Sequence, residues 1–254
     1  MSAELRLRDV AVTLGGVRIL DAVSLEVHAG ETFGIIGPNG AGKTTVLNAI
    51  SGVVPLQTGS VELDGVDLAG TRPHRRRELG IGRSLQTTQY HRDLTALELV
   101  ALSVAPNALV PALRLQAHRD RGDRADRGDR GPAMEALERL ALADVAHTRV
   151  GELPSGVQKL VDLARAILAG RSVLLLDEPT SGVGAPERRL VASVLAELGE
   201  EGRTIVVVDH DPGFVAACCE RVVCMNFGAV LVTGPPDEVL ASDEVRRSYL
   251  GDVA

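Results

Sequence analysis

Hydrophobic residues along this chain follow two different patterns, and each predicts a different kind of element. Two continuous apolar runs, 173–176 and 205–208, are typical of parallel strands buried on both faces. Apolar residues at helical spacing occupy 157–168, immediately before the first run. Strands that alternate with helices predict a mainly parallel sheet flanked by helices, which places the chain in the α/β class.

The first part of the chain has a different pattern. Apolar and polar residues roughly alternate over 5–12, and short apolar stretches follow at 23–27 and 61–63. Glycine-containing turns separate these stretches, as in hairpins. The pattern therefore predicts an antiparallel β patch beside the parallel sheet.

A helical subdomain is predicted over about 88–170. Helical periodicity at 95–104 and 133–142 indicates two of its helices. Between them, 118–131 reads HRDRGDRADRGDRG and holds no hydrophobic residue larger than alanine, so it predicts a charged, solvated loop. With 254 residues, we expect a single domain over 1–254 that includes this lobe.

Composition narrows the possible partners and location. A net charge of −7, 2% aromatic residues and no tryptophan argue against a nucleic-acid partner. The three cysteines fit neither a disulfide framework nor a metal-ligand spacing, so reduced thiols are expected. The start of the chain is charged, and the longest uncharged stretch, 99–113, is short for a membrane span and contains two prolines. These features predict a cytoplasmic protein that can dock on a membrane protein.

The strongest chemical signal is 34–52, GIIGPNGAGKTTVLNAISG. Gly37, Gly42, Lys43 and Thr44 complete the phosphate-binding pattern G-x-x-x-x-G-K-[ST]. An apolar strand pattern precedes the loop and a helical pattern follows it, which argues against a chance match in this glycine-rich chain. Backbone N–H groups and the helix N-terminus can then converge on one phosphate group.

Three further polar residues follow the two buried runs. Asp177 ends the first run and can hold magnesium, while Glu178 points elsewhere along the pleat and can polarise an attacking water. His210 follows the second run, where a donor could reach a γ-phosphate. The alternative is that two acids simply end a strand at the surface and that the histidine is structural.

Together these motifs resemble the ATPase subunit of an ABC transporter over essentially the whole chain. The resemblance rests on the phosphate loop, on Gln86 after 82–85, on 177–181 (DEPTS) and on His210. GPNGAGKTT, RSLQ, the extended connection through the helical lobe, Pro-Ser-Gly at 154–156 and the ending SYLG are similar to ATPases of branched-chain amino-acid importers, a group that includes urea and related amide systems. The implied fold is a P-loop NTPase core with a helical subdomain.

The resemblance implies a role for each motif residue in binding ATP and Mg²⁺. The loop residues implied to bind the nucleotide are Gly37, Pro38, Asn39, Gly40, Ala41, Gly42, Lys43, Thr44 and Thr45. Magnesium would be held by Thr44, Gln86 and Asp177. Glu178 would be the general base and His210 would fix the γ-phosphate, while Gln86 would also relay to the membrane partner.

Several partners are implied in the same way. In this family two ATPase subunits close head to tail around two ATP molecules, so Ser155 and Gly156 would contact ATP bound to the other subunit. Integral membrane permease subunits would be direct partners, and an extracytoplasmic solute-binding protein an indirect one. The chain would act at the cytoplasmic face of the membrane, with 86–99 and 99–113 as candidate docking segments.

The sequence departs from the family pattern at three places. Leu14 stands where an aromatic residue usually stacks on adenine, so Leu14 would hold adenine by apolar contact only, which predicts a weaker or base-tolerant site. Pro154 and Val157 alter the signature segment, and Gly184 replaces a common aspartate. Because these last changes face the partner's ATP, we expect an asymmetric heterodimer, with a homodimer as the alternative.

The expected function is therefore ATP binding and hydrolysis that powers an ABC importer for small solutes, such as branched-chain amino acids or related compounds. The alternative is a regulatory or soluble non-transport ABC-type ATPase with weak hydrolysis, which the altered signature favours and the presence of Glu178 and His210 disfavours. Ribosome- or DNA-associated forms usually join two ATPase domains or carry a long coiled coil, and neither pattern occurs in this chain. The transported substrate is not readable from these residues.

Overall fold

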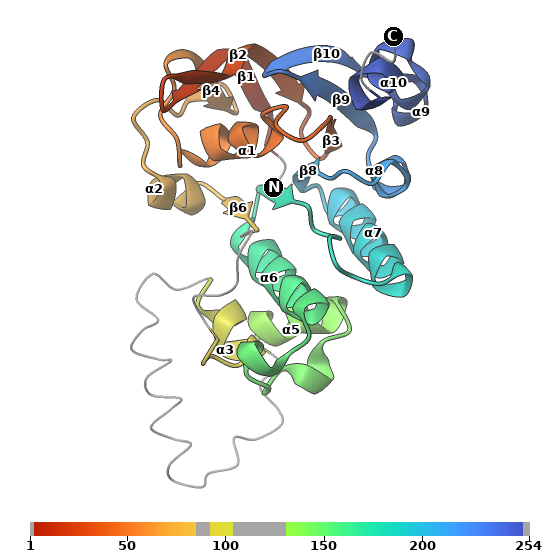
Figure 1. Cartoon of the computed structure of the whole chain (residues 1–254). Helices are drawn as coiled ribbons and strands as arrows, with labels where there is room; N and C mark the ends of the chain where they lie inside the picture. The colour runs from red at the N-terminus through yellow and green to blue at the C-terminus, as the bar shows by residue number, and fades with distance from the viewer. Residues whose placement is uncertain (1–2, 85–91, 104–130, 251–254) are drawn as a thin grey trace, which may run out of the picture.

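The computed structural model describes residues 3–84, 92–103 and 131–250, and Figure 1 shows how their elements are arranged. The strands are β1 (Leu5–Leu14), β2 (Val17–Val27), β3 (Thr32–Ile36), β4 (Thr58–Leu63), β5 (Val66–Asp67), β6 (Ile81–Arg83), β7 (Val173–Asp177), β8 (Thr204–Val208), β9 (Arg221–Asn226) and β10 (Ala229–Gly234). The α-helices are α1 (Lys43–Ser51), α2 (Pro73–Glu78), α3 (Ala96–Ala101), α5 (Pro132–Arg139), α6 (Ser155–Ala169), α7 (Ala185–Glu200), α8 (Pro212–Cys218), α9 (Pro236–Ala241) and α10 (Asp243–Leu250).

The strands form two sheets, which confirms the predicted division into an antiparallel patch and a mainly parallel sheet. The antiparallel sheet has the order β2-β1-β4-β5, and the second sheet has the order β10-β9-β3-β8-β7-β6. All neighbours in the second sheet are parallel except β10 and β9. Strand β3 therefore lies between β9 and β8, so the strand before the phosphate loop sits inside the sheet.

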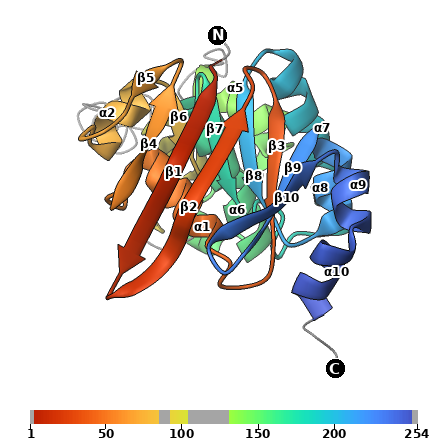
Figure 2. The same cartoon turned by 90° about the horizontal axis from the view of Figure 1, so that it is seen from above.

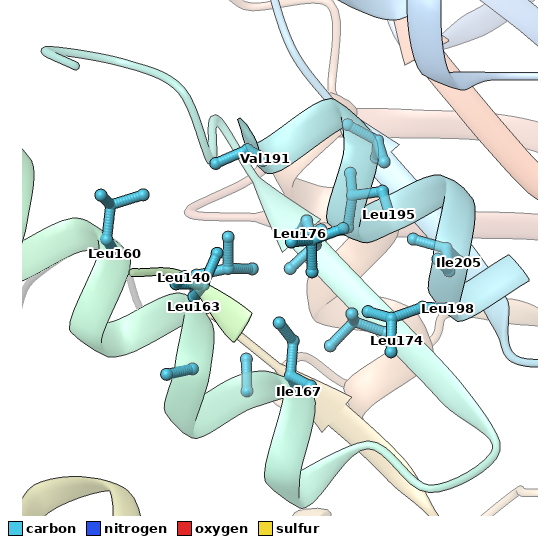
Figure 3. Close-up of a cluster of buried hydrophobic side chains, with 14 of the residues drawn as sticks. Leu140, Leu160, Leu163, Ile167, Leu174, Leu176, Val191, Leu195, Leu198 and Ile205 are labelled. Atoms are coloured by element: carbon cyan, nitrogen blue, oxygen red, sulfur yellow. The ribbon is translucent and has the colours of Figure 1, made fainter. Parts of the chain in front are cut away.

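Each central strand contributes to two cores, because successive side chains point to opposite faces of a sheet. Leu174 and Leu176 of β7 pack with α6 and α7, as Figure 3 shows, whereas Val173 and Leu175 pack with α1 and the antiparallel sheet. Figure 2 shows the antiparallel sheet on the opposite side of the parallel sheet from these helices. Strands buried on both faces explain the uninterrupted apolar runs in the sequence.

Helices α3, α5 and α6 pack against one another in the predicted helical lobe. Thr95 caps α3, since its hydroxyl accepts from the N–H of Glu98 at 3.2 Å and the Glu98 carboxylate accepts from the N–H of Thr95 at 2.8 Å. Helix α5 ends earlier than predicted because Ala141 adopts a left-handed conformation with φ of 54°. Segment 104–130, which contains most of the predicted charged loop, lies outside the described residues.

Candidate functional site

The phosphate loop connects β3 to α1 and folds as the motif predicts. Gly37 has φ of 145°, and a Cβ atom there would lie 2.2 Å from the carbonyl oxygen of Met225, so only glycine fits. Gly42 has φ of 97° and is the N-cap of α1. The first N–H groups of α1 have no partner within the helix, and together with the helix dipole they form a site for an anion.

Lys43 lies inside the loop that it belongs to. Its ammonium donates to the carbonyl oxygens of Gly37 at 2.7 Å and Pro38 at 2.8 Å, and the residue is buried. Burial lowers the pKa of Lys43, while the nearby carboxylates of Glu178 and Asp177 oppose that change. A cation is thus held at the centre of the loop, where it can meet a phosphate oxygen.

Thr44 and Asp177 meet across the end of the parallel sheet. The Thr44 hydroxyl donates to Asp177 Oδ1 at 3.2 Å, and the Asp177 N–H donates to Ser84 Oγ at 3.0 Å. Burial raises the pKa of Asp177, and the Thr44 hydrogen bond opposes this. Hydroxyl and carboxylate oxygens are the ligands that Mg²⁺ prefers, so this partly buried pair fits a magnesium ion.

Arg83 is a site residue that the sequence analysis missed. Its guanidinium lies 3.7 Å from Asp177 Oδ2 and donates to Asn48 Oδ1 at 2.6 Å and Ser51 Oγ at 2.8 Å. Its carbonyl oxygen accepts from Arg165 at 2.8 Å. Arg83 therefore connects α1, β7 and α6 around the acid. The available signal was a single arginine among small and apolar residues at 79–85.

Replacing Arg83 by methionine is expected to lower the free energy of unfolding by about 2–3 kcal/mol, because Asp177 stays buried after losing a cation. Urea denaturation followed by circular dichroism measures the change. Arg8→Met is the matched control, since Arg8 pairs with Glu62 at the surface and should matter by less than about 1 kcal/mol. Equal losses in the two variants would contradict a special role for Arg83.

Glu178 and His210 lie beside each other at the carboxyl ends of β7 and β8. His210 Nδ1 is 3.9 Å from Glu178 Oε1, and both side chains are exposed. Glu178 has φ of 47°, and its N–H donates to the carbonyl oxygen of Val208 at 2.7 Å. This left-handed backbone, unusual for a residue with a side chain, directs Glu178 away from the core while Asp177 stays inside.

Asp209 is a second residue that the sequence analysis missed. Its side chain is fully buried, accepting from the Thr180 hydroxyl at 2.9 Å and from the Asp211 N–H at 3.0 Å. The Thr180 bond joins the end of β8 to the segment after β7, and the Asp211 bond links the residues on either side of His210. The signal available was an acid directly before the histidine at the end of a buried run.

A cavity of about 200 Å³ lies beside the acids, between α6 and β7. Its walls include Ser84, Lys159, Asp177 and Glu178. The Lys159 ammonium donates to the carbonyl oxygen of Glu178 at 3.5 Å, a long contact. The cavity leaves room for water next to the carboxylates.

The other predicted site residues lie elsewhere in the fold. Ser155 and Gly156 begin α6, and a Cβ on Gly156 would lie 3.0 Å from the carbonyl oxygen of Gly182. Leu14 ends β1 next to the turn into β2, and 40% of it is exposed. Gln86 lies outside the described residues. The structure thus gathers the loop, Asp177, Glu178 and His210, and it sets the start of α6 beside the segment that precedes α7.

Known proteins that are similar to this chain bind ATP, in agreement with the geometry of the site. The ABC transporter family model matches residues 20–181. The chain is 29% identical to the high-affinity branched-chain amino acid transport ATP-binding protein BraF of Pseudomonas aeruginosa, over 98% of each chain. It is 31% identical to the lipopolysaccharide export system ATP-binding protein LptB of Escherichia coli, also over 98% of each.

Among solved structures, the ADP conformation of MJ1267, an ATP-binding cassette of an ABC transporter, superposes with a TM-score of 0.81. The two are 26% identical, and the match covers 99% of this chain and all of the other. The sequence-based expectations of a P-loop NTPase fold and an ABC-type ATPase are therefore confirmed. This chain belongs to the ABC transporter family, as an ATP-binding subunit that hydrolyses ATP.

Proposed function

We propose that this subunit powers an importer for small solutes, such as branched-chain amino acids or related compounds. End-to-end similarity to two branched-chain amino-acid transport subunits, BraF and the 30% identical LivG of Salmonella typhimurium, carries this proposal. The equally long match to LptB, from an export system, makes export the competing assignment. Identifying the proteins that bind this chain distinguishes import from export.

In the proposed site, the phosphate-loop residues 37–45 bind the phosphates of ATP. The Lys43 ammonium exchanges its carbonyl partners for phosphate oxygens, and Thr44 and Asp177 would hold magnesium. That ion would supply positive charge to offset the charge of the phosphates. Glu178 Oε1 accepts a proton from the attacking water, and His210 donates to the γ-phosphate. Gln86, outside the described residues, is proposed as a further contact to magnesium and water.

We infer that this chain pairs with a second ATPase subunit, and that each subunit contacts the ATP bound by the other. Helix α6 begins at Ser155, and its first N–H groups are suited to a phosphate bound by the other subunit. Pro154 has no N–H, Val157 is partly buried against the helical core, and Gly184 caps α7 beside the same corner. Pro154, Val157 and Gly184 thus lie near one another where the start of α6 meets the segment before α7, which supports a heterodimer. Strong cooperative hydrolysis by the isolated chain would contradict it.

The membrane partners are proposed to be integral permease subunits that this chain contacts at the cytoplasmic face, with an extracytoplasmic solute-binding protein as an indirect partner. Within 3–84, 92–103 and 131–250, no helix is long and apolar enough to cross a membrane. The candidate docking stretch 99–113 is described only as far as residue 103, where it forms the end of α3 and the following turn.

The test is a pull-down of the chain from its native membranes in mild detergent, with partners identified by mass spectrometry. Permease subunits, a second ATPase and a solute-binding protein would support the importer and the heterodimer. Export-type membrane partners without a binding protein would overturn import. Recovery of soluble partners alone would favour the regulatory or non-transport ATPase that the altered start of α6 suggests.

A further inference from the structure

Aromatic residues are scarce in this protein. The chain contains three phenylalanines, two tyrosines and no tryptophan. Phe33 and Phe214 are buried in the two cores, whereas 90% of Phe227 is exposed to solvent. Among the described residues, Phe227 is therefore the phenylalanine whose ring is available to a ligand.

Phe227 lies next to the phosphate loop. With Gly228 it forms the two-residue turn between β9 and β10. The Gly228 N–H donates to the carbonyl oxygen of Ala41 in the loop at 3.1 Å, and the Gly228 carbonyl oxygen accepts from the N–H of Asp21 in β2 at 2.9 Å. Phe227 is therefore the immediate neighbour of a residue that is hydrogen-bonded to the phosphate loop.

The backbone of Phe227 is strained. Its φ is 45° and that of Gly228 is 79°, so both central residues are left-handed, as a type I′ turn requires. Asparagine followed by glycine is the preferred pair in such turns, and a bulky residue there is an outlier. Strained conformations that persist in folded proteins concentrate at ligand-binding and active sites.

We propose that Phe227 stacks on the base of the bound nucleotide. A nucleotide whose phosphates occupy the loop must carry its base outside the loop, on the adjoining surface. Phe227 offers an apolar ring on that surface, and bases of every kind stack on aromatic rings. The stack would supply the aromatic contact that Leu14 cannot provide. This inference rests on the proposed placement of the phosphates in the loop.

The test compares the binding of ATP and of inorganic tripolyphosphate, which has no base, by isothermal titration calorimetry. Phe227→Asn should raise the Kd for ATP about tenfold and leave the Kd for tripolyphosphate unchanged. Its Tm should equal or exceed that of the wild type, because asparagine tolerates the left-handed backbone. Phe227→Tyr should retain ATP affinity. Leu231→Asn, an exposed position in β10 of the same hairpin, is the matched control and should bind ATP normally.

Wild-type affinity for ATP in Phe227→Asn would overturn the proposal, as would parallel losses of ATP and tripolyphosphate binding. Failure of the underlying phosphate assignment has a different signature. In that case Lys43→Met would bind tripolyphosphate as tightly as the wild type does, whatever Phe227→Asn shows.

Discussion

Replacing Glu178 by glutamine is expected to reduce ATP hydrolysis by about 10²- to 10⁴-fold, the contribution typical of a general base. The amide keeps the shape of the side chain but cannot take the proton of the attacking water. Glu178 is exposed and next to His210, and Asp177 rather than Glu178 contacts Thr44. ATP binding should therefore persist. Phosphate release measures hydrolysis, and calorimetry measures binding.

The matched control for this change is Glu197→Gln. Glu197 is an exposed residue of α7, so its replacement makes the same change in charge away from the loop. Its hydrolysis rate should stay within twofold of the wild type. A Glu178→Gln variant that hydrolyses ATP at a similar rate would show that another group activates the water.

Lys43→Met is expected to weaken ATP binding by about 10- to 100-fold, the range for losing a charged hydrogen bond to a phosphate. Methionine fills a similar volume but carries no donor. The loss should be largest for ATP and smaller for AMP, because the ammonium meets the outer phosphates. Calorimetry with both nucleotides measures the difference.

Arg75→Met is the control for Lys43→Met. Arg75 pairs with Glu78 on the surface of α2, so its replacement also removes one positive charge. It should leave nucleotide binding unchanged. If the two variants lost ATP affinity equally, the effect would come from net charge and not from the loop.

Some parts of the fold escaped the sequence analysis because local pattern did not define them. Strand β6 has three residues, too few for any periodicity. Strand β9, RVVCMN, begins soon after α8 ends, and a short apolar run cannot be told from buried helix by periodicity alone. Both are strands because they pair with β7 and β3, neighbours distant in the sequence.

The residues of the site divide in the same way. Glycine positions, Lys43 and Thr44 follow a fixed spacing within one loop, so the motif alone predicted their place. The apolar runs 173–176 and 205–208 predicted the buried strands that lead to Asp177 and His210. Local chemistry determines such features, because a tight phosphate loop needs glycine where the backbone has positive φ and a doubly buried strand needs apolar side chains on both faces.

Only the tertiary structure decided which distant residues meet. Strand order brings Arg83 to Asp177, and the β9–β10 turn brings Phe227 to the loop. No spacing in the chain encodes these contacts, because they depend on how the sheet is assembled and on which helix ends face it. The sequence alone therefore determined the chemistry of the nucleotide site, whereas packing between distant segments determined the residues that surround it.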